Sequence, residues 1–253
     1  MLLSTKHLSG FKILAKDEEI GKVHDFLIDD RSWIVRYIVV DIGNWLSGRK
    51  VLVVPSVAEK PDGKTESLPV LLSKKQVKES PGIDTDMPVS RAQEIKLHKH
   101  YQWEPYWYGS VFPVGPVHML PTPHPGAQKG KSFPEDREED ENTDPHLRSL
   151  KECRNYKIHA TDGEIGHIDD FIVDIGGWLI RYFVVDIRNW LPGKKVILSP
   201  SWIRDISWAE SEVTLTMNRE TVKASPEYNP SLPINMEYEA RLYDYYGKPK
   251  YWS

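Results

Sequence analysis

An internal duplication constrains the fold of this chain more than any other feature of its sequence. Residues 17–55 read DEEIGKVHDFLIDDRSWIVRYIVVDIGNWLSGRKVLVVP, and residues 162–200 read DGEIGHIDDFIVDIGGWLIRYFVVDIRNWLPGKKVILSP, at a constant offset of 145 residues. About half of the aligned positions are identical. The same offset relates Ser80-Pro81 to Ser225-Pro226, Pro88 to Pro233 and Tyr106-Trp107 to Tyr251-Trp252. The chain therefore contains two copies of one structural unit.

The duplication divides the chain into three parts. We expect a first repeat with an aromatic extension over residues 1–108, a linker over 109–145, and a second repeat with its own extension over 146–253. The linker holds seven prolines, and its residues 135–144 carry seven acids and one arginine. Such a segment buries too little apolar surface to offset its ordering entropy, so it is expected to be extended and partly mobile.

Each repeat is predicted to be rich in β-strands. Runs of β-branched and aromatic residues predict two long strands at 19–29 and 33–41, and two more at 164–174 and 178–186. Shorter strands are expected at 51–54 and 68–72. Five or six short strands in about 80 residues leave open edges, which closure into a small barrel removes.

A helix is predicted after the strands of each repeat. Ser73 and Gln76 have the spacing of a capping box, and Pro81 ends the segment. Asn218 is a suitable N-cap for the equivalent helix. We therefore expect a mainly β chain of two small barrels, each with a short C-terminal helix, related by the duplication about a pseudo-twofold axis.

Each repeat resembles the PRC-barrel family, the β-barrel domain of the photosynthetic reaction-centre H subunit that also occurs at the C-terminus of a ribosome-maturation factor. The residues that carry the resemblance are Lys12-Ile13, Gly21-Lys22-Val23, Asp25-Phe26-Leu27-Ile28-Asp29 and Arg36-Tyr37-Ile38-Val39-Val40-Asp41, with Ile165-Gly166-His167-Ile168, Asp170-Phe171-Ile172-Val173-Asp174 and Arg181-Tyr182-Phe183-Val184-Val185-Asp186. The resemblance implies a six-stranded barrel used as an adaptor or assembly platform. None of these residues is implied to be catalytic.

Composition argues against several classes of function. No apolar run approaches the ~18 residues that a transmembrane helix needs. The net charge of −4 argues against a dedicated nucleic-acid binder. The single Cys153 excludes an intramolecular disulfide and a thiolate zinc site. Without a visible secretory signal, a cytoplasmic location is expected, with peripheral membrane association as an alternative.

Tryptophans at turns and in the extensions are candidate interface residues. A tryptophan at an exposed loop tip either covers the end of a barrel or forms an interface hot spot. The same two interpretations apply to Trp33 and Trp178, at the start of the second long strand of each repeat, and for these two a place in the core is favoured. The candidate set is Trp33, Asn44, Trp45, Trp103, Trp107, Trp178, Asn189, Trp190 and Trp252.

The acids shared by the two repeats could act as acid/base pairs or could stabilise turns. The structural interpretation is favoured because these acids lie at predicted strand ends, where Asp caps backbone amides, and an arginine lies nearby in each repeat. The expected turn caps and ion pairs involve Asp25, Asp29, Arg36, Asp41, Asp170, Asp174, Arg181 and Asp186.

Two histidines, His98 and His100, would share one face if they lay on an extended strand. Adventitious metal binding is the favoured interpretation there, because no second shell is recognisable. Walker A, dinucleotide-binding, nucleophile-elbow and zincin motifs are not found. No catalytic residue, cofactor or physiological metal is therefore expected.

These observations lead to one main hypothesis and two alternatives. The main one is a non-enzymatic adaptor or assembly protein that binds a protein partner, not nucleic acid, through its barrel surfaces. The first alternative, from the family resemblance, is a peripheral factor of a membrane or photosynthetic electron-transport complex. The second is a small-ligand protein that uses a cleft between the barrels. Self-association is left open.

Overall fold

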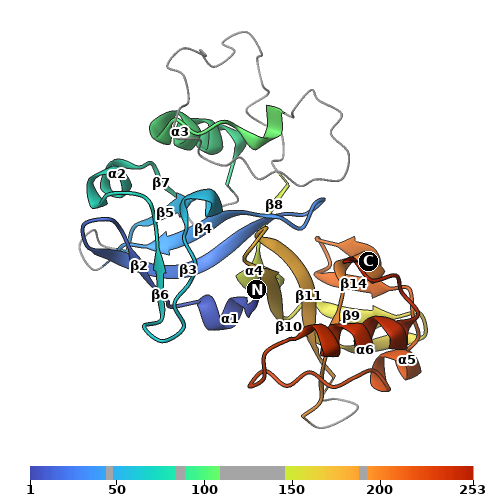
Figure 1. The fold of residues 1–253 in the computed structure, drawn as a ribbon. Coiled ribbons are helices and arrows are strands. Elements are labelled where there is room, and N and C mark those ends of the chain that lie inside the picture. Colours follow the sequence, from blue (N-terminus) through green and yellow to red (C-terminus); the bar gives the residue numbers. More distant parts are fainter. Residues whose placement is uncertain (44–47, 84–88, 109–145, 188–192, 253) are drawn as a thin grey trace. The chain divides into compact units, whose positions relative to one another are not determined.

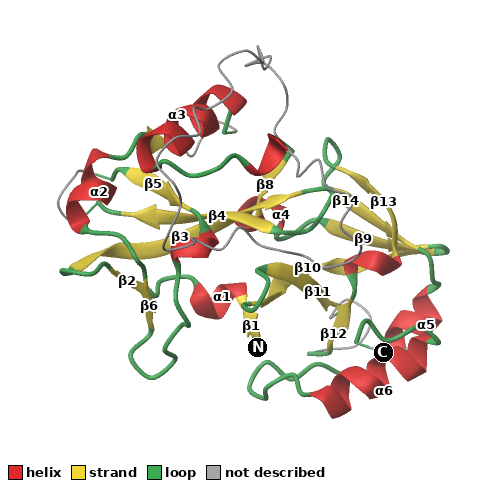
Figure 2. Ribbon diagram, turned by 45° about the horizontal axis from the view of Figure 1, so that its top comes forward, coloured by secondary structure: helices red, strands yellow, loops and turns green. Residues whose placement is uncertain are grey.

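The computed structural model describes residues 1–43, 48–83, 89–108, 146–187 and 193–252. Contacts divide the chain into two compact units, which we call the first-repeat unit, Leu8–Ser149, and the second-repeat unit, Met1–His7 with Leu150–Ser253. Each is mainly β, with a seven-stranded mixed sheet and a few short helices (Figure 1, Figure 2). The predicted linker and the loop tips with Asn44, Trp45, Asn189 and Trp190 lie outside the described residues.

The sheet of the first-repeat unit has the order β6-β2-β3-β4-β5-β7, with β8 beside β3. The predicted long hairpin is confirmed as the antiparallel pair β3 and β4, whereas β2 and β6 run parallel. The predicted strand at 68–72 is shorter. The strands are β2 (Lys12–Leu14), β3 (Glu19–Asp29), β4 (Val35–Asp41), β5 (Lys50–Val53), β6 (Ser67–Pro69), β7 (Gly82–Ile83) and β8 (Leu147–Ser149).

The sheet of the second-repeat unit has the order β12-β11-β10-β9-β14-β13, with β1 beside β10. Five of these strands repeat the order of the first sheet, and the two sheets differ in the outermost strands β7 and β13. Its long hairpin, β10 and β11, is antiparallel, and β9 and β14 run parallel. The strands are β1 (Leu2–Ser4), β9 (Lys157–Ala160), β10 (Gly163–Asp174), β11 (Leu179–Asp186), β12 (Lys195–Leu198), β13 (Ile203–Ser207) and β14 (Glu212–Leu215).

Both predicted helices are confirmed, but each is followed by a longer one. Ser73 forms a full capping box with Gln76, and Asn218 accepts from the backbone N–H of Thr221. The longer helices begin at two further N-caps, Ser90 and Asn235. The helices are α1 (Thr5–Leu8), α2 (Lys74–Glu79), α3 (Arg91–Tyr101), α4 (Leu150–Cys153), α5 (Arg219–Lys223) and α6 (Met236–Tyr246), with 3-10 turns η1 (Pro55–Val57), η2 (Tyr106–Tyr108) and η3 (Pro200–Trp202).

Removing the cap of α3 tests its contribution to stability. Ser90 accepts from the N–H of Gln93, whose side chain accepts from the N–H of Ser90 in return. We expect Ser90→Ala to lower the free energy of unfolding by about 1 kcal/mol, measured by urea denaturation. Ser90→Asp retains an acceptor and should cost much less; equal costs for the two variants would contradict the capping role.

The two repeats exchange their first strands. Strands β1 and β8 occupy equivalent sequence positions, at the offset of 145 residues. Yet β1 pairs with β10 of the second repeat, and β8 pairs with β3 of the first. The compact units therefore differ from the division at 1–108 and 146–253, because each contains the opening strand of the other repeat.

One hydrophobic cluster of the first-repeat unit lies between its sheet and α3. Leu27, Tyr37, Val39 and Leu52 of the sheet form one buried cluster with Leu97 of α3. Leu147 of the exchanged β8 belongs to the same cluster. The exchanged strand thus contributes to the hydrophobic core as well as to the sheet. Among the described residues, no helix is long and apolar enough to cross a membrane.

Candidate functional site

A set of buried titratable groups lies where α3 packs on β4. The capping box at Ser90 starts α3, and from there Glu94 and His98, one helical turn apart, reach Tyr37 on β4. Glu94 and Tyr37 are fully buried. We call this set the Glu94 cluster; it comprises Arg36, Tyr37, Arg91, Glu94, His98, Trp103, Tyr106 and Trp107.

Glu94 is the centre of this cluster. Its Oε1 accepts from the hydroxyls of Tyr37 and Tyr106, both at 2.8 Å. Its Oε2 lies 2.8 Å from Nη1 of Arg91, one turn back on α3. Burial raises the pKa of Glu94, and the Arg91 charge and the two tyrosine hydroxyls oppose that rise. Burial also raises the pKa of both tyrosines, so they remain O–H donors.

The hydrogen bonds of the cluster require one shared proton. The Nδ1 of His98 lies 3.3 Å from the carbonyl oxygen of Trp103, which can only accept, so Nδ1 carries a hydrogen. The Nε2 of a neutral His98 then accepts from the Tyr37 hydroxyl, 2.8 Å away. Tyr37 has one proton for both Nε2 and Glu94 Oε1. The Tyr37 hydroxyl can therefore donate to only one of these two acceptors at a time.

Arginines cover the aromatic side of the cluster. The guanidinium of Arg36 lies 4.2 Å from the ring centroid of Tyr106 and pairs with Asp29 at 2.8 Å. The guanidinium of Arg91 lies 4.2 Å from the ring centroid of Trp107. These cation–π contacts fix the segment around η2 on the sheet and α3.

The second repeat builds an equivalent set, which we call the Glu239 cluster. Its members are Arg181, Tyr182, Glu239, Tyr243, Tyr251 and Trp252. Glu239 Oε1 accepts from the hydroxyls of Tyr182 at 2.5 Å and Tyr251 at 2.9 Å. The guanidinium of Arg181 lies 4.1 Å from the ring centroid of Tyr251. Glu94 and Glu239 share the offset of 145 residues, the signal that could have identified both from the sequence.

The two clusters differ at two positions on the helix. Met236 replaces Arg91, and Tyr243 replaces His98. The Tyr243 hydroxyl is hydrogen-bonded to Tyr182, as His98 is to Tyr37. A tyrosine hydroxyl can donate a hydrogen bond, which Nε2 of a neutral His98 cannot. Tyr182 can therefore accept from Tyr243 while it donates to Glu239.

Acid should weaken the first-repeat unit through His98. Burial lowers the pKa of His98 to about 4, below the ordinary 6.5. The unfolded chain therefore binds more protons between pH 6.5 and 4, and the free energy of unfolding should fall with decreasing pH there, by up to about 1.4 kcal/mol per pH unit. His98→Tyr, which copies Tyr243, should flatten this part of a denaturation-versus-pH curve. An unchanged slope would contradict the assignment.

The structure places the shared acids as follows. Asp29 pairs with Arg36 and accepts from the N–H groups of Arg31 and Ser32, and Asp174 lies 3.5 Å from Arg181. The contacts of Asp29 lower its pKa against the effect of burial. The pKa of Asp174 is also lowered against burial, first by the α-ammonium group of Met1 at 3.1 Å, then by the N–H of Gly176, and last by Arg181. Asp25 and Asp170 accept from serines of the exchanged strands, Ser149 and Ser4. Asp41 accepts from the N–H of Gly43, and Asp186 is buried.

The described candidate interface tryptophans lie within the units rather than at free tips. Trp178 is buried, and Trp33 is half-buried; both have left-handed backbone, with φ of 49° and 60°. Trp103 stacks on Tyr101 with ring centroids 4.1 Å apart, Trp107 contacts His98, and Trp252 contacts Tyr243 and Tyr251.

The segment of His98 and His100 is helical rather than extended, because it belongs to α3. The buried polar groups of this helix mask its apolar pattern in the sequence. His98 is hydrogen-bonded to Tyr37 and Trp103, and Nε2 of His100 lies 3.0 Å from the carbonyl oxygen of Gln76. Both imidazoles are therefore engaged by the protein.

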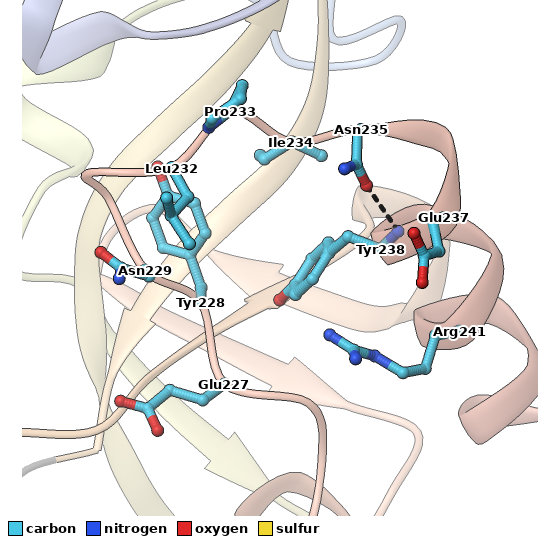
Figure 3. A pocket seen from close by; sticks show the side chains of 10 residues that line it. All are labelled: Glu227, Tyr228, Asn229, Leu232, Pro233, Ile234, Asn235, Glu237, Tyr238 and Arg241. Carbon is cyan, nitrogen blue, oxygen red and sulfur yellow. Dashed lines mark hydrogen bonds between the residues drawn. The ribbon is translucent and has the colours of Figure 1, made fainter.

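A hollow of about 350 Å³ lies in the second-repeat unit, between the loop before α6 and its first turns (Figure 3). The rings of Tyr228 and Tyr238 and the guanidinium of Arg241 surround it. Leu232 and Met236, 62% and 55% exposed, lie in the same loop and first turn. This mixed lining has neither a paired acid and base nor a nucleophile with its base among the described residues.

The geometry of the two clusters is better suited to holding a helix on the sheet than to catalysing a reaction. A substrate from solvent has no access to Glu94 or Tyr37, which are 0% exposed. In both repeats the glutamate joins a helix, a strand and the aromatic segment that follows the helix.

Comparison with known proteins identifies one domain. Residues 4–65 match the PRC-barrel domain family, so the chain contains a PRC-barrel domain at its N-terminus. No curated protein matches the chain. The matched residues include β3, β4 and Tyr37, the strand residue of the Glu94 cluster.

Proposed function

We propose that this protein is a non-enzymatic adaptor or assembly protein made of two PRC-type barrels. The second sheet supports a second PRC domain, because its strands β14-β9-β10-β11-β12 repeat the order β6-β2-β3-β4-β5 of the first. The closure of each sheet into a barrel and their pseudo-twofold relation are part of the same proposal.

One observation carries the non-enzymatic part. The chemically versatile residues that the repeats share, Glu94 with Tyr37 and Glu239 with Tyr182, are buried and hydrogen-bonded to each other in both copies. Because these duplicated residues hold the helix on the sheet, we infer that the functional part of the molecule is its surface. Surface recognition of a protein partner is the activity that this arrangement supports best.

The test is affinity capture of the tagged full chain from soluble and detergent-solubilised membrane fractions of its native host. Recovery of a stoichiometric protein partner is the expected result. The double variant Leu232→Ser, Met236→Ser, which removes exposed apolar side chains beside the hollow, asks whether that face takes part. Recovery of the bare protein from both fractions, with a thermal shift caused by a small molecule, would favour a ligand-binding protein instead.

A further inference from the structure

The strand exchange raises the question of what directs each first strand to the other repeat. The two strands read Leu-Leu-Ser and Leu-Arg-Ser, and both place a serine on an equivalent aspartate, Ser4 on Asp170 and Ser149 on Asp25. These shared contacts would form equally well if each strand paired within its own repeat. Discrimination must therefore come from positions where the repeats differ.

One such position is Asp30 in the turn after β3. Its carboxylate is 5% exposed, with Oδ2 2.9 Å from Nε of Arg148 and Oδ1 3.2 Å from Nδ1 of His146. Arg31 donates to Nε2 of His146 at 2.6 Å, so the imidazole hydrogen lies on Nδ1, facing Asp30. The backbone N–H of Asp30 also donates to the carbonyl oxygen of His146.

The other repeat offers neither half of this contact. The residue equivalent to Asp30 is Ile175, and the residue equivalent to Arg148 is Leu3. Pairing within each repeat would bring Leu3 to Asp30 and Arg148 to Ile175. A nearly buried carboxylate would then lose its arginine, and the arginine would face an isoleucine, both of which are costly.

We propose that Asp30, through Arg148 and His146, selects the strand that the first-repeat unit receives and so directs the exchange. The second-repeat unit then receives β1, because the apolar Leu3 of this strand is compatible with the apolar Ile175. One charged contact, rather than the sequence pattern that the two strands share, thus determines the exchange.

Cysteine reporters on the full chain test this proposal, in a Cys153→Ala background. Ser149 lies opposite Leu27 in the observed pairing, and would lie opposite Ile172 if β8 paired within its own repeat. The pair Ser149→Cys with Leu27→Cys therefore reports exchange, and Ser149→Cys with Ile172→Cys reports its absence. Both pairs remove the same serine, and directly opposed strand residues are within disulfide range.

We expect the exchange reporter to cross-link within one chain and the other reporter to remain reduced. Transplanting the charge with Leu3→Arg and Arg148→Leu should reverse the two yields, by about tenfold or more. Arg148→Lys, which keeps the charge, should leave the exchange reporter in excess. Equal yields before and after transplantation, or cross-links between two chains, would overturn the proposal.

A second variant covers the case in which the transplanted chain fails to fold. Asp30→Leu removes the carboxylate, so that neither strand has to supply a cationic side chain. The sequences of β1 and β8 stay unchanged. Circular dichroism checks that the variant folds, and its reporters should then give comparable yields of both pairings. A full excess of the exchange reporter in folded Asp30→Leu would also overturn the proposal.

Discussion

Gly166→Ala should lower the free energy of unfolding by about 4 kcal/mol or more, and Gly21→Ala should have a similar effect. A Cβ at either glycine would meet the carbonyl oxygen of the facing strand, Asp186 or Asp41, far inside van der Waals contact. The obstacle is backbone, not a flexible side chain, so the long hairpin itself would have to move. The measurement is chemical denaturation followed by circular dichroism and tryptophan fluorescence.

Gly177→Ala is the matched control for this prediction. It lies in the turn after β10, and a Cβ there meets nothing within 4 Å. We expect a change below about 0.5 kcal/mol. If Gly166→Ala and Gly177→Ala lowered the free energy of unfolding by the same small amount, the close approach of the two strands at Gly166 would be contradicted.

Glu94→Leu should have the second large effect, about 3 to 5 kcal/mol. The substitution leaves the guanidinium of Arg91 and the hydroxyls of Tyr37 and Tyr106 without their common acceptor. Glu94→Gln keeps an acceptor for both tyrosines and should cost less. The free energy of unfolding, measured by urea denaturation, gives the order of the two variants.

The second repeat provides the comparison for Glu94. Glu239→Leu leaves two tyrosines without an acceptor but no arginine, because Met236 stands at the position of Arg91. Its cost should therefore be smaller than that of Glu94→Leu. A larger loss at Glu239 would contradict the role given to the Arg91 charge.

The strands and the short helices could be predicted because their signals are local. Runs of β-branched and aromatic residues identify β3, β4, β10 and β11, and the capping box at Ser73 identifies α2. The longer helices were missed because they bury polar residues: α3 turns Arg91, Glu94 and His98 inward, which hides its apolar face. Partners for those groups become visible only after folding.

The strand exchange could not be predicted from a local pattern either. A three-residue strand carries no record of which sheet it joins, and β1 and β8 differ mainly at Leu3 and Arg148. The candidate site was recognised in part. Arg36 and Arg181 were selected as partners for acids, whereas Glu94 and Glu239 were identified only when the helices placed them on Tyr37 and Tyr182.

Quantitative affinity capture tests directly whether this protein acts by binding a protein partner. The tagged wild-type chain and Gly177→Ala, which keeps the fold, are compared with the unfolding variant Gly166→Ala, and bound proteins are quantified by mass spectrometry. We expect a stoichiometric partner on the first two proteins and its loss from the third. Recovery of the bare wild-type protein from both soluble and membrane fractions would contradict it.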